Sequence, residues 1–375
     1  MTSKEPGGLY IGLISGTSMD GIDAALVELG EHTCTTLATR SHDYPEALRE
    51  RLLEASRQPE SVSVDDLGRL DHAVGKCFRD AAHELMALSG TDATSIRAIG
   101  SHGQTIRHLP RDAEPFTLQI GDPNLIATGT GVTTVTDFRR RDVALGGEGA
   151  PLAPGFHQWL FGNDAKSRVV LNIGGFANVT VLPATGDLVT GFDTGPGNSL
   201  LDAWHRRHVG GPFDAGGAWA DSGKVNDALL ETCLQDPYFV ATPPKSTGFE
   251  YFNLEWLEQL LGDKKIEPAE VQATLLALTV SSIRNAIDAF AGETDEILVC
   301  GGGVHNDALM RELTDAVAPI AVKSTEEFGL HPDWVEAAAF AWLASRTLNG
   351  LPGNLPEVTG AERKAVLGCI YAGTS

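Results

Sequence analysis

The sequence predicts an α/β protein of two domains. The chain has 375 residues, which is enough for two domains at about 100–200 residues each. Short apolar segments typical of strands alternate with longer stretches of helical character. A strand, a small-residue turn and a second strand occur twice, at residues 9–29 and 169–182. We interpret this echo as two domains built on one plan, with coincidence between two ordinary hairpins as the alternative.

The first half of the chain is predicted to begin with a hairpin. Strands at 9–14 and 22–29 flank a turn at 15–20 that is rich in Gly, Ser and Thr. Residues 46–90 interleave apolar and charged positions as helices do. Two more strands are expected at 96–100 and 116–120, the first ending at Ser101-His102-Gly103-Gln104.

The second half repeats this pattern. Strands at 169–173 and 178–182 flank the turn Gly174-Gly175-Phe176, and apolar residues from Leu276 to Phe290 at a 4-3-4-3 spacing predict one buried helix face. A strand at 297–300, the glycines 301–303 and a helix opening near Asn306 follow. Helix N-termini and free amides attract anions, so this edge is expected to face a nucleotide, with a plain αβ connection as the alternative.

Charge and cysteine content exclude several classes of protein. Asp and Glu number 50 against 28 Lys and Arg, a net charge of −22, which disfavours nucleic acid or an anionic membrane as a partner. The five cysteines form no CxxC pair, so we expect no disulfide framework or zinc site, and a cytoplasmic location. No apolar window approaches a membrane span, and the N-terminal residues do not resemble a signal peptide.

Common catalytic signatures are absent. Gly75-Lys76 continues with Cys77, so there is no P-loop, and no HExxH motif occurs. The segment Gly100-Ser101-His102-Gly103 is one residue short of GxSxG. The sequence therefore does not support a P-loop enzyme, a zincin or an α/β-hydrolase.

The tip of the first hairpin is a candidate phosphate site. Hydroxyls and free amides between Ser15 and Asp23 can cradle a polyphosphate. Asp20 and Asp23 can hold the accompanying Mg²⁺, directly or through water, because hard cations prefer oxygen ligands. The alternative is an ordinary Asx/Gly hairpin turn.

Three consecutive arginines stand out in so acidic a chain. Arg139, Arg140 and Arg141 are followed by Gly146-Gly147-Glu148-Gly149, a composition typical of backbone that passes close to a ligand. Arginine recognises carboxylate or phosphate bidentately. For Arg140 and Arg141 a solvated charge run is an equally good interpretation.

Asp193 is the candidate catalytic residue. It is expected at a strand end, followed by the glycine-rich turn Thr194-Gly195-Pro196-Gly197, which would hold its carboxylate rigid but exposed. Such a carboxylate can act as a general base. The alternative is an Asx turn that caps a helix starting near Asn198.

These segments together resemble the anhydro-N-acetylmuramic acid kinase family. The similarity rests on GLISGTSMDGIDAALVE, GSHGQTIRH, LQIGDPNLIA, DFRRRDVALGGEGAPL, LNIGGFANVT, GFDTGPGN, PPKSTGFEYFN, ILVCGGGVHN and LPGNLPEVTGA, in this order between about residues 9 and 371. The resemblance implies a two-domain actin-like ATPase fold of the sugar kinase and Hsp70 superfamily, with ATP and Mg²⁺ in the cleft between the domains. It also implies a small anhydro amino sugar as substrate and a homodimer.

The resemblance further implies which residues act. The nucleotide would be bound by Gly16, Thr17, Ser18, Met19, Asp20, Gly21, Ile22 and Asp23, with Gly174, Gly175, Gly301, Gly302 and Gly303. Asp193 would be the base, and Asp20 and Asp23 the metal ligands. The substrate carries a lactyl carboxylate, so we expect Arg139 to compensate its charge, while Ser101, His102 and Gln104 meet hydroxyls or the N-acetyl group. For His102 a purely structural role is the alternative.

The two domains are expected to have the following boundaries. Residues 1–137 with 350–375 are expected to form the N-terminal domain, and 138–349 the second.

The implied reaction opens the 1,6-anhydro ring and phosphorylates O6 in cell-wall recycling. A kinase of an ordinary open-ring amino sugar and a nucleotide-switched binding protein are the alternatives, and the 375-residue length disfavours a chaperone with a separate peptide-binding domain.

Overall fold

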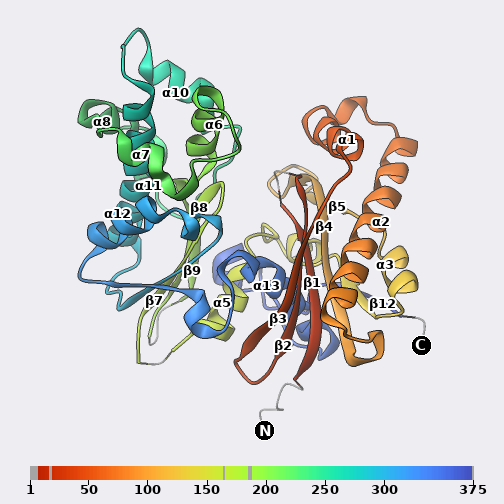
Figure 1. Cartoon of the computed structure of the whole chain (residues 1–375). Coiled ribbons are helices and arrows are strands. Elements are labelled where there is room, and N and C mark those ends of the chain that lie inside the picture. The colour runs from red at the N-terminus through yellow and green to blue at the C-terminus, as the bar shows by residue number, and fades with distance from the viewer. Residues whose placement is uncertain (1–6, 17–18, 164, 185–187, 374–375) are drawn as a thin grey trace. The chain divides into compact units, whose positions relative to one another are not determined.

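A computed structural model describes residues 7–16, 19–163, 165–184 and 188–373 (Figure 1). The chain divides into two compact units. The first comprises residues 1–160 and 329–375, and the second comprises residues 161–328. Within the described residues, no helix is long and apolar enough to cross a membrane.

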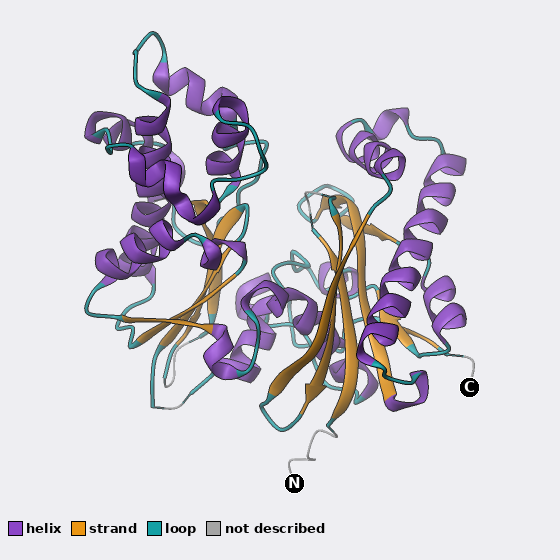
Figure 2. Cartoon of the chain, in the orientation of Figure 1, coloured by secondary structure: helices purple, strands orange, loops and turns teal. Residues whose placement is uncertain are grey.

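The first unit is built on a mixed sheet with helices on both faces (Figure 2). The sheet has seven strands, in the order β12-β6-β4-β1-β2-β3 with β5 beside β4. Its strands are β1 (Gly8–Ser15), β2 (Gly21–Leu29), β3 (Cys34–Asp43), β4 (Ile96–Leu109), β5 (Phe116–Ile120), β6 (Thr134–Thr136) and β12 (Cys369–Tyr371). Its helices are α1 (Glu46–Arg57), α2 (Val64–Ser89), α3 (Pro123–Thr130), α4 (Arg140–Ala144), α5 (Ala153–Phe161), α13 (Val335–Leu348) and α14 (Pro356–Thr359).

Glycines let α13 lie directly on this sheet. Alternate residues of a strand face opposite sides, so Ile11 and Leu13 join the core under α1 and α2 while Gly12 faces the other way. A Cβ at Gly12 would lie 1.7 Å from the carbonyl oxygen of Ala337, and one at Gly100 would lie 2.0 Å from that of Phe340. Only glycine on β1 and β4 therefore permits this backbone-to-backbone packing.

The second unit has a five-stranded sheet in the order β11-β10-β7-β8-β9. Its core lies between this sheet and α11, α12 and α6. The strands are β7 (Arg168–Ile173), β8 (Phe176–Leu182), β9 (Thr190–Pro196), β10 (Glu296–Cys300) and β11 (Ala321–Ser324). The helices are α6 (Ser199–His208), α7 (Ala218–Ser222), α8 (Asp227–Leu234), α9 (Pro237–Val240), α10 (Leu254–Leu261), α11 (Pro268–Phe290) and α12 (Asp307–Val317), with a 3-10 turn, η4 (Gly302–His305).

The two sheets share one topology. Three antiparallel strands, β3-β2-β1 in the first unit and β9-β8-β7 in the second, continue into parallel strands, β4-β6 and β10-β11 respectively. A long helix, α2 or α11, connects the third antiparallel strand to the first parallel one. The repeated hairpin in the sequence is therefore part of a repeated α/β unit, as predicted.

The structure corrects several expected boundaries. β4 runs on through Leu109, so Ser101, His102 and Gln104 lie inside a strand because β1 and β5 pair with it there. Asp193 likewise lies in the middle of β9 instead of at a strand end, since β8 pairs with β9 as far as Pro196. Residues 138–160 and 329–349 group with the first unit and not the second, because α13 packs on β1, β2 and β4.

Candidate active site

Hydrogen bonds to Gln104 of β4 hold the end of β1, where the β1–β2 hairpin turns. The Ser15 hydroxyl lies 2.7 Å from both the Gln104 Oε1 and the Gly21 carbonyl oxygen, and the Gln104 amide donates to the Gly16 carbonyl at 3.2 Å. Gln104 is fully buried. Its amide therefore fixes the start of the turn.

The residues at the tip of the hairpin differ in whether their side chains are exposed or buried. Gly16 is exposed, whereas the side chains of Met19 and Ile22 belong to the hydrophobic core, which leaves only their backbone for a ligand. Met19 adopts a φ of 54°, a left-handed conformation uncommon for a non-glycine residue. Thr17 and Ser18, which were expected to bind nucleotide, lie outside the described residues.

The two candidate metal ligands differ in environment. The Asp20 carboxylate is 69% exposed and forms an ion pair with Arg49 at 3.0 Å. Asp23 is half-buried and accepts a hydrogen bond from the Ser41 hydroxyl at 2.6 Å. Burial raises the pKa of Asp23 above its ordinary value. No group of three or more metal-ligating side chains occurs among the residues that the structure describes.

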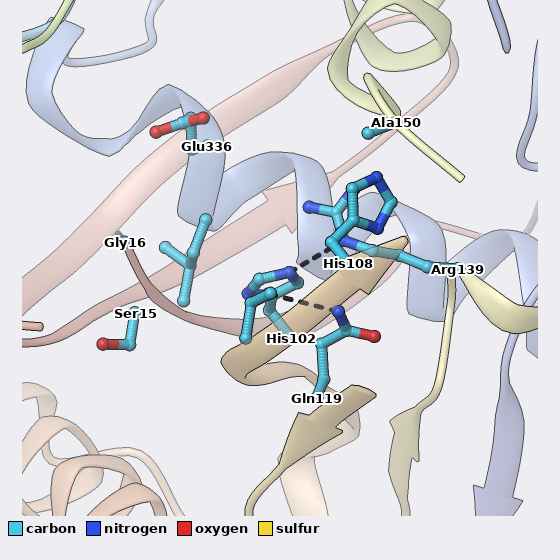
Figure 3. Close-up of a pocket in the computed structure, with 10 residues that line it drawn as sticks. Ser15, Gly16, His102, His108, Gln119, Arg139, Ala150 and Glu336 are labelled. Carbon is cyan, nitrogen blue, oxygen red and sulfur yellow. Dashed lines mark hydrogen bonds between the residues drawn. The ribbon is translucent and has the colours of Figure 1, made fainter. Parts of the chain in front are cut away.

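A cavity of about 340 Å³ opens beside this hairpin, wholly within the first unit (Figure 3). Polar side chains from five different segments converge on it. Its lining residues are Ile14, Ser15, Gly16, His102, Thr105, His108, Gln119, Arg139, Ala150 and Glu336. Two of the four predicted substrate-binding residues, His102 and Arg139, thus meet here, while Ser101 and Gln104 are buried behind the wall.

Arg139 and His102 form a fixed pair. The Arg139 Nε donates to the His102 Nε2 at 3.0 Å, and its Nη1 donates to the Gly149 carbonyl at 2.8 Å. A nitrogen that accepts from a guanidinium carries no proton, so the proton of neutral His102 resides on Nδ1. Burial and the Arg139 charge hold the pKa of His102 well below its usual range. His102 is therefore uncharged at neutral pH.

Glu336 places a carboxylate in the same cavity. It stands in the first turn of α13, and its exposed side chain lines the cavity. Desolvation by the neighbouring protein raises the pKa of Glu336, and the Arg139 charge opposes that rise. Nothing in the sequence singled out Glu336, because a lone acidic residue at a helix start is typical of ordinary helices.

Asp142 holds the loop that completes the cavity edge. It is fully buried and accepts hydrogen bonds from the Asn354 amide at 2.7 Å, the Thr359 hydroxyl at 2.8 Å and the Gly149 N–H at 2.8 Å. Since Gly149 is also the acceptor for Arg139, the buried network fixes the guanidinium indirectly.

Asp193 lies in the second unit with its carboxylate half-buried. The Thr247 N–H donates to its Oδ2 at 3.0 Å, and among the described residues no hydrogen bond reaches Oδ1. Burial raises the pKa of Asp193 to about 6. The alternative interpretation as a helix cap does not hold, because α6 begins after Asn198 with no side-chain capping bond.

The glycines of the two turns in the second unit differ in how closely they are packed: Gly301 and Gly303 are tightly packed, whereas Gly174, Gly175 and Gly302 are not. The carbonyls of Gly174 and Gly175 accept from the N–H groups of Asn198 and Gly197, at 2.9 Å each. A Cβ at Gly301, whose φ is 82°, would lie 2.4 Å from the Asn172 side chain, whereas one at Gly302 would meet nothing within 4 Å. Gly302 therefore leaves open space beside the turn that precedes α12.

Comparisons with known proteins decide the family. A family model described as anhydro-N-acetylmuramic acid kinase matches residues 8–373. The anhydro-N-acetylmuramic acid kinase of Coxiella burnetii (strain RSA 493 / Nine Mile phase I) is 50% identical over 365 residues, covering 97% of this chain and 97% of its own. That of Xylella fastidiosa (strain Temecula1) is 50% identical over 372 residues, with 98% and 97% covered.

The chain belongs to the anhydro-N-acetylmuramic acid kinase family. As a member of that family it is an ATP-using phosphotransferase, and the family resemblance predicted from its motifs is confirmed. Among solved structures it is similar to a ROK hexokinase from Thermus thermophilus, with a TM-score of 0.36 and 16% identity over 90% of this chain and 99% of that one. The shared topology of its own two sheets agrees with the expected two-domain actin-like fold of an anhydro-N-acetylmuramic acid kinase.

Proposed function

We propose that the chain hydrolytically opens the 1,6-anhydro ring of 1,6-anhydro-N-acetylmuramic acid and phosphorylates O6 with ATP. The products are N-acetylmuramic acid 6-phosphate and ADP, and the process served is cell-wall recycling. The observation that carries this proposal is the match to the family over residues 8–373, supported by 50% identity to the relatives along almost the whole chain. Because those relatives are named for the anhydro sugar, an open-ring amino sugar is not favoured.

In the proposed reaction Asp193 takes the proton of a water molecule. Its pKa of about 6 leaves it ionised at neutral pH yet more basic than an ordinary carboxylate. The water oxygen bonds to the anomeric carbon, the bond from that carbon to O6 breaks, and O6 takes the γ-phosphoryl group as ADP leaves. Glycosidases use a second carboxylic acid to protonate the leaving oxygen. Here the phosphoryl group replaces that proton, so one carboxylate suffices.

The cavity of the first unit fits an anionic amino sugar. Arg139 uses Nε and Nη1 on His102 and Gly149, and its remaining donors can meet the lactyl carboxylate. Neutral His102, with Gln119 and His108, offers hydrogen bonds without adding charge. Glu336 is a second carboxylate of raised pKa and the alternative candidate for the base.

The donor set also fits a Mg²⁺ that accompanies the nucleotide. Asp23 combines a half-buried carboxylate with a raised pKa, and among the described residues only Ser41 donates to it, so it suits a hard cation better than Asp20, which pairs with Arg49. The metal, when bound, neutralises phosphate charge. In the first unit the exposed Gly16, and in the second unit the Gly174-Gly175 turn and the open space at Gly302, are each candidates to offer backbone amides to a phosphate.

The proposal is tested with the purified chain, ATP and Mg²⁺, in H₂¹⁸O. The anhydro sugar should be consumed with one ADP per product, and mass spectrometry should place the label at the anomeric hydroxyl and not in the phosphate ester. Asp193→Asn should lose both ring opening and phosphorylation by about 10²–10⁴-fold, the usual contribution of a positioned base. Phosphorylation of the open sugar alone, or label in the ester bridge, would refute the proposed mechanism. If Asp193→Asn stays active while Glu336→Gln does not, the base is Glu336.

A cytoplasmic location and a homodimer also belong to the proposal. The location follows from the five scattered cysteines, and the homodimer follows from the resemblance to the family. Light scattering on the purified protein at micromolar concentration checks the dimer, which a monomer mass would rule out.

A further inference from the structure

Asp193 lies on the edge strand of its sheet. β9 is the last strand of the order β11-β10-β7-β8-β9, so one side of it pairs with β8 and, among the residues that the structure describes, no strand pairs with the other side. The register between β8 and β9 shifts next to Asp193, opposite Asn178. A buried N–H or C=O on such an edge needs another partner.

The segment after α8 supplies those partners at residue 193. The Tyr238 hydroxyl donates to the Asp193 carbonyl at 2.8 Å, and the Asp193 N–H donates to the Lys245 carbonyl at 3.1 Å. The Thr247 N–H then donates to the carboxylate itself, at Oδ2. Three hydrogen bonds from residues 238–247 thus hold both the backbone and the side chain of one residue.

Tyr238 is itself rigidly held. Its N–H donates to Asp236, which caps α9, and its ring packs edge-on against Phe252 at 5.3 Å between centroids. The Lys245 ammonium lies 4.8 Å from the centre of the Tyr238 ring and donates to the Tyr238 carbonyl at 3.1 Å. Burial and the charge of Asp193 raise the pKa of Tyr238, so its hydroxyl remains a donor throughout the working pH range.

We propose that Tyr238 is a positioning residue for Asp193: its hydroxyl fixes the edge-strand backbone so that Thr247 binds Oδ2 and Oδ1 stays free to take the proton. The inference rests on the proposed role of Asp193 as the base. Tyr238 touches neither water nor sugar in this scheme, and it acts only through the orientation of the carboxylate.

Tyr238→Phe keeps the ring contacts and removes the donor. The Asp193 carbonyl then loses its partner, and the backbone of residue 193 is held less firmly. The hydrogen bond from Thr247 to the carboxylate weakens as a result. Because this bond stabilises the charged form, the pKa of Asp193 rises. We expect kcat to fall about tenfold, the size expected when one hydrogen bond of about 1.4 kcal/mol is lost. The KM values for sugar and ATP should change less than twofold, and the acid limb of the kcat/KM profile should move to higher pH.

Tyr251→Phe is the matched control. The Tyr251 hydroxyl donates to Asp236 at 2.8 Å in the same segment, its side chain is 43% exposed, and it makes no hydrogen bond to Asp193. This variant should keep the wild-type kcat and pH profile. An acid limb midpoint does not depend on the fraction of active protein, so partial misfolding of Tyr238→Phe cannot imitate the shift.

Asp193→Asn, alone and combined with Tyr238→Phe, separates the two hypotheses. If Asp193→Asn is inactive and Tyr238→Phe leaves kcat and the acid limb unchanged, the positioning role is wrong while the base survives. If Asp193→Asn retains activity, the proposed base itself is wrong. If the shift occurs and the double variant is no slower than Asp193→Asn, Tyr238 acts through the Asp193 carboxylate as proposed.

Discussion

Asp193 carries its charge where the surroundings disfavour charge. Burial raises its pKa from 3.8 to about 6, and Thr247 and Lys245 offset only part of that rise. The same environment that makes the carboxylate a useful base therefore makes it unfavourable for folding. Such opposition between activity and stability is common at catalytic groups.

This opposition predicts opposite pH responses of activity and stability. The value of kcat/KM should be half-maximal near pH 6 and fall about tenfold per unit below it, because the base must be ionised. The free energy of unfolding responds in the other sense. The folded-state pKa lies above the ordinary value, so between about pH 4 and 6 the folded protein binds more protons, and stability declines as pH rises.

Asp193→Asn should accordingly raise the free energy of unfolding at pH 8 by on the order of 1 kcal/mol, with the gain shrinking toward pH 4. Urea unfolding at both pH values measures it. An equal effect at pH 4 and pH 8 would mean that the charge is not the cause.

Arg139 is predicted to select the lactyl carboxylate. We compare the lactyl sugar with an analogue that lacks the lactyl group. Arg139→Ala should reduce the ratio of their kcat/KM values by about tenfold or more, since hydrogen bonds to charged groups contribute about 1.5–3 kcal/mol. Arg140→Ala is the control. The Arg140 side chain is next in sequence to Arg139, is 56% exposed and does not line the cavity. An unchanged ratio in Arg139→Ala would remove Arg139 from substrate selection.

At the scale of elements, the contact between α13 and the sheet determines both the stability of the first unit and the position of Glu336. Gly12 and Gly100 bring the helix backbone against β1 and β4, and α13 carries Glu336 into the cavity. A methyl group at either glycine would overlap a helix carbonyl. Stability and the placement of Glu336 therefore depend on the same contact.

Gly12→Ala should lower the free energy of unfolding by at least about 1–3 kcal/mol, the usual cost of overpacking a core. Gly68→Ala is the matched control. Gly68 lies in α2 with open space around its Cα, so a methyl group there should raise helix stability by about 0.5–1 kcal/mol. Denaturant unfolding of both variants checks the pair, and equal effects would contradict the packing argument.

Sequence patterns predicted elements better than they predicted the site. Both hairpins, α11 and β10 follow from apolar spacing, but β3 was missed because Cys34–Asp43 is largely polar on an edge. β4 was cut short at Gly100 because the polar segment that follows resembles a loop, although β1 and β5 pair with it. Glu336 and Tyr238 could not be found from the sequence, since only long-range contacts bring them to their sites.

At the scale of the whole molecule, the charge of −22 is the dominant property. Net charge of this size destabilises the compact state through self-repulsion, and salt screens it over a Debye length of about 10 Å at 0.1 M. The midpoint of thermal unfolding should therefore rise by a few degrees between 10 and 150 mM KCl. Sucrose of matched osmolality is the control. A falling midpoint would mean that local ion pairs outweigh the net repulsion.

The discontinuous first unit also has a consequence for synthesis. Residues 1–160 leave the ribosome first, but the helix that covers one face of their sheet ends only at residue 348, after the entire second unit. The interval is 348 − 160 = 188 residues, which takes about 10–40 s at about 5–20 residues per second. Hydrophobic collapse takes only microseconds. The face of the sheet that α13 covers in the folded protein is therefore without that helix during this interval.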